Sequence, residues 1–402
     1  MTSVLNLDNE LNLGNEPEFQ LGGPAYRLMQ RLGLIRPGTP SLLRRFIAFV
    51  LLTWVPLLIL ALFEGKALGP TPQESLLLDF ATYARFFLGI PLLFLSEVTV
   101  GPRLRMAGRQ FLQGHFIREE DLPAFAAAVG RIRQRREALL PEMVMVVLAF
   151  IGAWFLAIET WTAAGPALSW RSGDPESLLG LSLAGFWYYL VAVPLLQFFV
   201  SRWLWRLIIW TLFLFELSRL DLRLIPTHPD RAAGLGFLGG AHLSLGIFPF
   251  AFSCVLSANL AFQIYFGGAP IESFKLLFVV YLVVMLLLIL GPLLIFTPKL
   301  ARTRRQGMRE YSLLANDYNR AFHQKWVIGP PPDDEPLLGS SDIQSLADLG
   351  NSFGFIRDMK IFPFSQQQIL QIVIIASLPG LPLIFLVMPV MELLNLLAGA
   401  LL

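Results

Sequence analysis

The sequence predicts an all-α polytopic membrane protein with about seven transmembrane helices and a cytoplasmic layer of helices. Two observations carry this prediction. The 402 residues are 55% hydrophobic and only 15% charged, with a mean hydropathy of +0.61, whereas charged residues make up about a quarter of a soluble domain. The charges are also missing from long apolar blocks and gathered between them. Helices are expected because they satisfy their backbone hydrogen bonds within one segment.

Each apolar block is long enough to cross a bilayer, whose core of about 30 Å needs about 20 helical residues. The blocks lie near 46–63, 76–100, 143–163, 178–200, 243–266, 274–297 and 367–390. They divide the chain into a polar arm with a surface helix (1–45), three pairs of spans (46–100, 143–200 and 243–297), a broken last span with its tail (367–402), and three inner segments (101–142, 201–242 and 298–366).

Positive charge orients these spans. Of the 31 Lys and Arg, five lie in 27–45, eight in 101–142, five in 201–242 and nine in 298–366; the others are Lys66, Arg85, Arg171 and Lys275. Loops rich in Lys and Arg stay in the cytoplasm. We therefore expect a cytoplasmic amino terminus and a carboxy terminus on the other side. The first 26 residues lack an apolar core of signal-peptide type, so no cleavage is expected.

The second and fourth spans each allow two interpretations. Asp79 and Arg85 lie in an otherwise apolar stretch. Either the span starts in the outer interface, which we favour, or both side chains face a protein interior. The apolar block 177–218 exceeds one crossing. Two spans there would move the arginines that follow it to the outside, so we expect one helix that continues into the cytoplasm and packs on other inner helices.

The last span is interrupted by Pro379-Gly380-Leu381-Pro382. It forms either one kinked span with an interfacial tail, or a half-helix followed by a full span. Interrupted helices at membrane depth can line an ion or substrate path, because their freed carbonyls face a cavity. Pro379 and Gly380 are therefore candidate pathway residues, although prolines are common in membrane helices.

Ionisable and glycine residues gather between the fourth and fifth spans. Polar groups beside lipid are costly unless paired, so the cluster is a functional-site hypothesis. Its candidate pathway residues are Asp221, Arg223, His228, Asp230, Arg231, Gly234 and Gly236. We interpret the two glycines as points of close backbone approach. They belong to a GxGxxG spacing, but no strand precedes it, so a nucleotide site is not predicted.

His228, Asp230 and His242 offer nitrogen and oxygen ligands of the kind that bind metals. They are scattered, without a second short-spaced pair. We favour a turn in which Asp230 caps the next helix and pairs with an arginine. No metal site and no cofactor are predicted. The chain also lacks a recognisable catalytic signature, so we do not expect an enzyme.

Arginines crowd two inner segments. They are Arg131, Arg133, Arg135 and Arg136 at the end of a predicted helix, and Arg302, Arg304 and Arg305 after the sixth span. Basic clusters beside a membrane meet anionic lipid headgroups more often than nucleic acid. We expect contacts with the bilayer and its anionic inner-leaflet lipids, and no nucleic-acid partner. Assembly into a homo-oligomer is left open.

Several runs in the last third of the chain resemble a family of bacterial polytopic inner-membrane proteins with no assigned activity. The runs are Tyr311-x-x-Leu314-Ala315, Lys325-Trp326-Val327, Glu335-Pro336-Leu337-Leu338-Gly339 and Asp342-Ile343-Gln344-Ser345-Leu346-Ala347-Asp348-Leu349. The resemblance implies a bacterial inner-membrane location and supplies no function.

Two functions follow as hypotheses. The proline-broken spans and the ionisable residues at 221–231 favour an ion channel or solute transporter of unspecified substrate. The alternative is a non-transporting membrane scaffold or sensor that acts through its basic cytoplasmic layer.

Overall fold

The computed structural model describes residues 22–36, 41–163, 169–173, 180–329 and 340–387. Within these ranges the chain is helical and contains no β-strand, which confirms the all-α prediction. The predicted polar arm before residue 22, the proline-rich linker within 330–339 and the tail after residue 387 lie outside the described residues.

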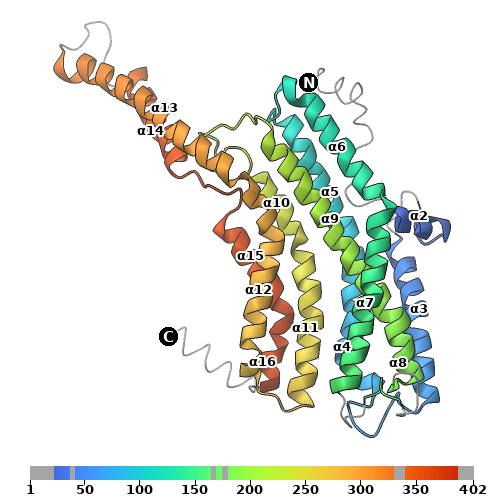
Figure 1. Cartoon of the computed structure of the whole chain (residues 1–402). Coiled ribbons are helices and arrows are strands. Elements are labelled where there is room, and N and C mark those ends of the chain that lie inside the picture. Colours follow the sequence, from blue (N-terminus) through green and yellow to red (C-terminus); the bar gives the residue numbers. More distant parts are fainter. Residues whose placement is uncertain (1–21, 37–40, 164–168, 174–179, 330–339, 388–402) are drawn as a thin grey trace.

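Seven helices of the described ranges are long and apolar enough to cross a membrane. They are Leu42–Phe63, Phe80–Gln113, Leu139–Ile158, Leu183–Arg219, Phe237–Tyr265, Ile271–Ile328 and Gln366–Leu386. They match the predicted spans and give the chain the build of an integral membrane protein. In Figure 1 they run side by side, with α6 (Leu122–Glu137) and α10 (Phe237–Leu243) at one end. We call this end the basic end, and the other the opposite end.

The second and fourth spans each contain a wide, π-helical segment just before a proline. The second span comprises α4 (Phe80–Tyr83), η2 (Ala84–Gly89) and α5 (Ile90–Gln113), and the fourth comprises α8 (Leu183–Trp187), η5 (Tyr188–Ala192) and α9 (Val193–Arg219). Pro91 and Pro194 follow these wide turns. Proline has no N–H, and its ring clashes with the carbonyl four residues earlier. A locally wider turn accommodates the ring without ending the helix.

The fourth span is a single helix from Leu183 to Arg219, as the charge pattern predicts. Its basic-end half packs on α6, where Trp210, Phe213, Leu214 and Leu217 of α9 are buried. Phe213 meets Phe125 of α6 with ring centroids 6.0 Å apart. The apolar extension is thus covered by another helix of the chain rather than left exposed.

The first and third spans are α3 (Leu42–Phe63) and α7 (Leu139–Ala163), and the short helix α2 (Pro24–Arg31) precedes them. The fifth span combines α10 with α11 (Ile247–Tyr265). The seventh consists of α15 (Gln366–Ser377), η10 (Leu378–Gly380) and α16 (Pro382–Val387). Its two alternative continuations fall in the tail outside the described residues.

The sixth span continues far beyond the bundle. It comprises α12 (Lys275–Leu290), η8 (Gly291–Phe296), α13 (Thr297–His323) and η9 (Gln324–Ile328). It changes direction near η8, after which α13 leaves the bundle together with α14 (Ser341–Arg357) (Figure 1). We call the pair α13–α14 the arm.

Three contacts to Asp342 hold the outer part of the arm together. Its carboxylate accepts hydrogen bonds from Lys325 Nζ at 2.7 Å and Trp326 Nε1 at 2.9 Å, and its backbone carbonyl accepts one from the Tyr318 hydroxyl at 3.0 Å. The helix α14 continues without a break through Gly350 and Gly354. One glycine costs a helix only about 1 kcal/mol, which the flanking turns and packing on α13 offset.

Candidate functional site

The predicted cluster between the fourth and fifth spans folds into a tight loop around Asp230. Its carboxylate accepts backbone hydrogen bonds from Ala232 at 2.8 Å, Gly234 at 3.1 Å and Gly236 at 2.8 Å. Burial raises the pKa of Asp230, but these donors and His228 outweigh it and hold the pKa below its ordinary value. The carboxylate therefore organises the chain that leads into α10. It is not the N-cap predicted for that helix, because Gly236 holds the N-cap position and no side chain caps the helix.

The expected arginine partner of Asp230 is wrong. His228 Nδ1 lies 2.9 Å from Asp230 Oδ1 instead. Arg231 follows with a positive φ of 55°, a conformation that L-residues seldom adopt.

The two candidate glycines of this loop are points of close approach, as interpreted from the sequence. A Cβ on Gly234 would come 2.6 Å from the Phe116 ring, and one on Gly236 would come 2.9 Å from Asp230 Oδ2. Gly234 also has a φ of 93°, which favours glycine. Both therefore have a folding role in this loop.

Asp221 and Arg223 lie elsewhere, in a polar cavity of about 360 Å³ at the base of the arm. The cavity also includes Arg118, Lys299 and Arg302. Arg118 Nη2 pairs with Asp221 Oδ2 at 2.7 Å. Two residues of the predicted pathway and one predicted lipid-contacting arginine thus meet in one place.

Pro379 and Gly380 lie in η10 of the last span, where a Cβ on Gly380 would be 3.3 Å from Phe278. The structure therefore divides the predicted pathway residues among the Asp230 loop, the cavity at the arm base and the last span.

Several of the predicted lipid-contacting arginines pair within the chain. Arg131 and Arg135 both bind Glu216, at 2.9 and 3.0 Å, and Arg136 binds Glu137 at 2.9 Å. Arg304 donates to the Arg357 carbonyl at 2.7 Å. Arg133, Arg302 and Arg305 are exposed.

A charge cluster that was not predicted from the sequence is buried among four spans. Glu97 of α5 binds Arg206 of α9 at 2.8 Å and also pairs with Arg45 of α3. Arg202 of α9 lies 3.4 Å from Glu142 of α7. None of the five residues is more than 8% exposed. Such a buried network is costly to desolvate unless its members are paired and hydrogen-bonded.

The arginine partners of Glu97 come from two neighbouring helices, α3 and α9. The sequence signal for this cluster is a lone carboxylate inside an apolar stretch, which requires a cation on a neighbouring helix. The sequence around the carboxylate does not indicate which helix supplies that cation.

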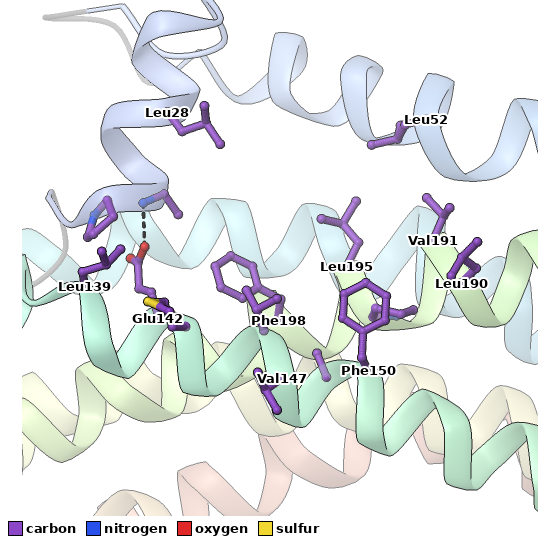
Figure 2. Close-up of a pocket in the computed structure, with 16 residues that line it drawn as sticks. Leu28, Leu52, Leu139, Glu142, Val147, Phe150, Leu190, Val191, Leu195 and Phe198 are labelled. Carbon is purple, nitrogen blue, oxygen red and sulfur yellow. Dashed lines mark hydrogen bonds between the residues drawn. The ribbon is translucent and has the colours of Figure 1, made fainter.

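The same cluster fastens α2 to the bundle. Glu142 Oε2 accepts a hydrogen bond from the Ala25 backbone N–H at 2.6 Å, and Arg202 Nη2 donates to the Gly22 carbonyl at 2.9 Å. The Gly23 N–H donates to Glu137 Oε1 at 3.3 Å. Figure 2 shows the first of these contacts at the end of α2. A carboxylate at the start of a helix also stabilises the helix dipole.

Beside α2 lies an apolar groove of about 650 Å³, bordered by α3, α7 and the fourth span (Figure 2). Glu142 is the one ionisable side chain among the described residues that line it. Leu28 and Leu52 face Val147, Phe150, Leu195 and Phe198 across the groove. An apolar pocket with a converging polar group is a candidate binding site.

At the opposite end, Asp79 is buried and caps α4. Its carboxylate accepts hydrogen bonds from the Thr82 N–H at 3.0 Å and Trp170 Nε1 at 3.0 Å, and it pairs with Arg171. Burial opposes its ionisation, but Arg171 and these donors hold its pKa below the usual value. Arg85 donates to the Tyr188 hydroxyl. Both side chains are therefore held by protein groups at the start of the second span.

His242 is fully buried in α10 and bound on both ring nitrogens. Trp210 Nε1 donates to its Nε2 at 2.8 Å, and its Nδ1 lies 2.6 Å from the Ile289 carbonyl. The structure does not bring it together with His228 and Asp230. Across the described ranges, no group of three His, Cys, Asp or Glu side chains could hold a metal ion.

Comparison with known proteins finds no matching family model, no curated protein and no solved structure.

Proposed function

We propose that this chain is a non-transporting membrane scaffold or sensor that binds a soluble partner protein through its arm. The observation that carries the proposal is the sixth span, one helix of 58 residues that crosses the bundle and continues outside it as α13. A span needs only about 20 residues. The remainder, paired with α14, extends beyond the bundle in Figure 1, where a soluble protein can reach it.

The surface of the arm supports this role. Leu313 and Leu314 are 60% and 53% exposed, and Val327 and Ile328 near its tip are similarly open. These four side chains stay exposed although α13 and α14 pack against each other. Apolar residues gathered on an exposed, projecting element are typical of a protein-binding surface.

The proposal includes an orientation in which the basic end and the arm lie in the cytoplasm of a bacterium, at its inner membrane. The charge pattern supports it, since Lys66, Arg171 and Lys275 are the few cations of the opposite-end loops. Arg133 and Arg305 would then meet anionic lipid at the inner leaflet.

Site-specific photo-cross-linking tests the partner. A photoreactive residue at Leu314 is compared with one at Glu120, which is exposed and lies directly before α6 rather than on the arm. We expect a discrete adduct with one soluble protein from position 314 only, and its loss in the variant Leu313→Asp. Equal adducts from both positions, or none from either, would overturn the proposal.

A channel or solute transporter is the second candidate, because the Arg–Glu cluster lies inside the bundle. Ionisable residues within spans often mark an ion or substrate path. Flux through reconstituted liposomes distinguishes the two functions. A substrate-specific flux that is reduced by Glu97→Gln or Asp230→Ala would favour the transport function. The absence of flux for any common ion would favour the scaffold or sensor function.

A further inference from the structure

The apolar groove beside α2 has the position and lining of a lipid site. Its walls come from α3, α7 and the fourth span, each long and apolar enough to cross a membrane. The open side of the groove therefore faces hydrocarbon rather than water. A volume of about 650 Å³ falls in the range of about 300–1,000 Å³ that holds one small ligand.

The helix α2 lies at one end of the groove, which gives the groove a direction (Figure 2). Pro24, Ala25 and Leu28 of α2 line that end beside Glu142. The Ala25–Glu142 hydrogen bond and the Arg202–Gly22 contact hold α2 there. A chain entering from the bilayer would lie along Val147 and Phe150 and stop below α2 (Figure 2).

The surface of α2 favours a negative headgroup at this end of the groove. The helix contains Arg27 and Arg31 and no acidic residue. Arg27 pairs with Glu137, while Arg31 is exposed. Arg31 follows Leu28 by three residues, so the two side chains are neighbours on the helix surface. A phosphate beside Arg31 would sit directly above a chain in the groove.

We propose that the groove binds one acyl chain of an anionic phospholipid, with its phosphate beside Arg31. This site is independent of the partner that the arm binds. Lipid tails are as apolar as the groove, so burial alone gives no preference over bulk lipid. Selectivity must come from the fit of the chain and from the charge at α2.

Photolabelling in nanodiscs tests the site. The probe is phosphatidylglycerol with a diazirine on one acyl chain, and adducts are mapped by mass spectrometry. Val147 and Phe150 line the groove, whereas Val144 and Phe155 of the same helix are exposed outside it. A lipid that prefers the groove over the bulk bilayer by about 1.4 kcal/mol occupies it tenfold more often. A bound lipid also exchanges more slowly than a bulk one, so we expect labelling of the groove side to be at least about fivefold higher.

Two variants locate the effect. Val147→Trp should fill the groove and abolish the enrichment, and the matched control Val144→Trp should preserve it. Arg31→Gln should remove the preference over a phosphatidylcholine probe without changing the folded fraction. Competition on the wild-type protein covers the case in which Val147→Trp does not fold: unlabelled phosphatidylglycerol should displace the probe and phosphatidylcholine should not. Equal labelling of both helix faces, or equal displacement by both lipids, would overturn the proposal.

Discussion

The loss of Glu97 should reduce the stability of the fold more than the loss of any other residue discussed here, because its carboxylate neutralises two buried arginines. Removing one partner of a buried pair leaves an uncompensated charge and costs about 3–5 kcal/mol. We expect Glu97→Gln to lower the melting temperature clearly in detergent, measured by intrinsic tryptophan fluorescence. Glu120→Gln is the matched control, since its side chain is 73% exposed and such surface pairs contribute about 0–1 kcal/mol. Similar melting of both variants would contradict a structural role for the cluster.

Asp230 should control the protection of its loop against hydrogen exchange. Replacing it with Ala removes the acceptor of the Ala232, Gly234 and Gly236 amides. A lost hydrogen bond to a charged group costs about 1.5–3 kcal/mol, and partial exposure reduces this, so we expect exchange at these amides to rise about tenfold at neutral pH. Mass spectrometry measures the rates. Asp221→Ala, at the arm base, should leave them unchanged.

The same carboxylate predicts a pH dependence with a definite sign. Its pKa is lower in the folded chain than the ordinary value of 3.8. The stabilisation of the loop is therefore fully present above that value and is lost as the pH falls through the folded-state pKa. Protection of the three amides, corrected for intrinsic exchange, should decline only below about pH 4. A decline that begins well above this range would contradict control by the Asp230 carboxylate.

At the scale of elements, two glycines of the arm should respond oppositely to the same change. A Cβ on Gly307 of α13 would come 2.7 Å from Pro226 and 3.3 Å from Ile356, whereas Gly354 of α14 has open space around it. We expect Gly307→Ala to destabilise the arm by about 1–3 kcal/mol through overpacking. Gly354→Ala should stabilise it by up to about 1 kcal/mol.

Spin-label distances between the arm and the bundle, together with proteolysis of the arm, measure this difference. Gly307→Ala should broaden the distance distribution and speed cleavage, and Gly354→Ala should do neither. Equal behaviour of both variants would mean that α13 is not held against the 221–226 loop.

The elements themselves were predictable to different degrees. The seven spans follow from hydropathy, because lipid forces each crossing to be a long helix with internal hydrogen bonds. The single helix that reaches Arg219 could be predicted from the distribution of positive charge. The continuity of α14 could not be predicted, because a glycine disfavours a helix only weakly and packing can outweigh it.

The binding features were far less predictable. Glu97 meets Arg206 across 109 positions of the sequence, and the groove is assembled from α2 and three separate spans. The ionisable cluster at 221–236 drew attention because a tight loop needs the same residue types as a binding site. Asp230 there binds its own backbone.

At the scale of the whole molecule, the proposed threading places the two ends of the bundle in different compartments. Cys254 is the only cysteine of the sequence, so Cys254→Ser gives a clean background. We expect a cysteine introduced at Thr71, in the opposite-end loops, to react with an impermeant maleimide in intact cells. One introduced at Arg223 should react only after permeabilisation. Reaction of both from the same side would contradict the threading.

The change of direction in the sixth span has a mechanical consequence. At Gly291-Pro292 the helix lacks one N–H donor and tightens into a short 3₁₀ segment, so this is where bending is least costly. Beyond it, the 27 residues of α13 make a rod about 40 Å long, and a rotation of about 10° at this pivot would swing its tip through roughly 7 Å. Small rearrangements among the spans would thus be amplified into displacements that a protein at the tip can detect.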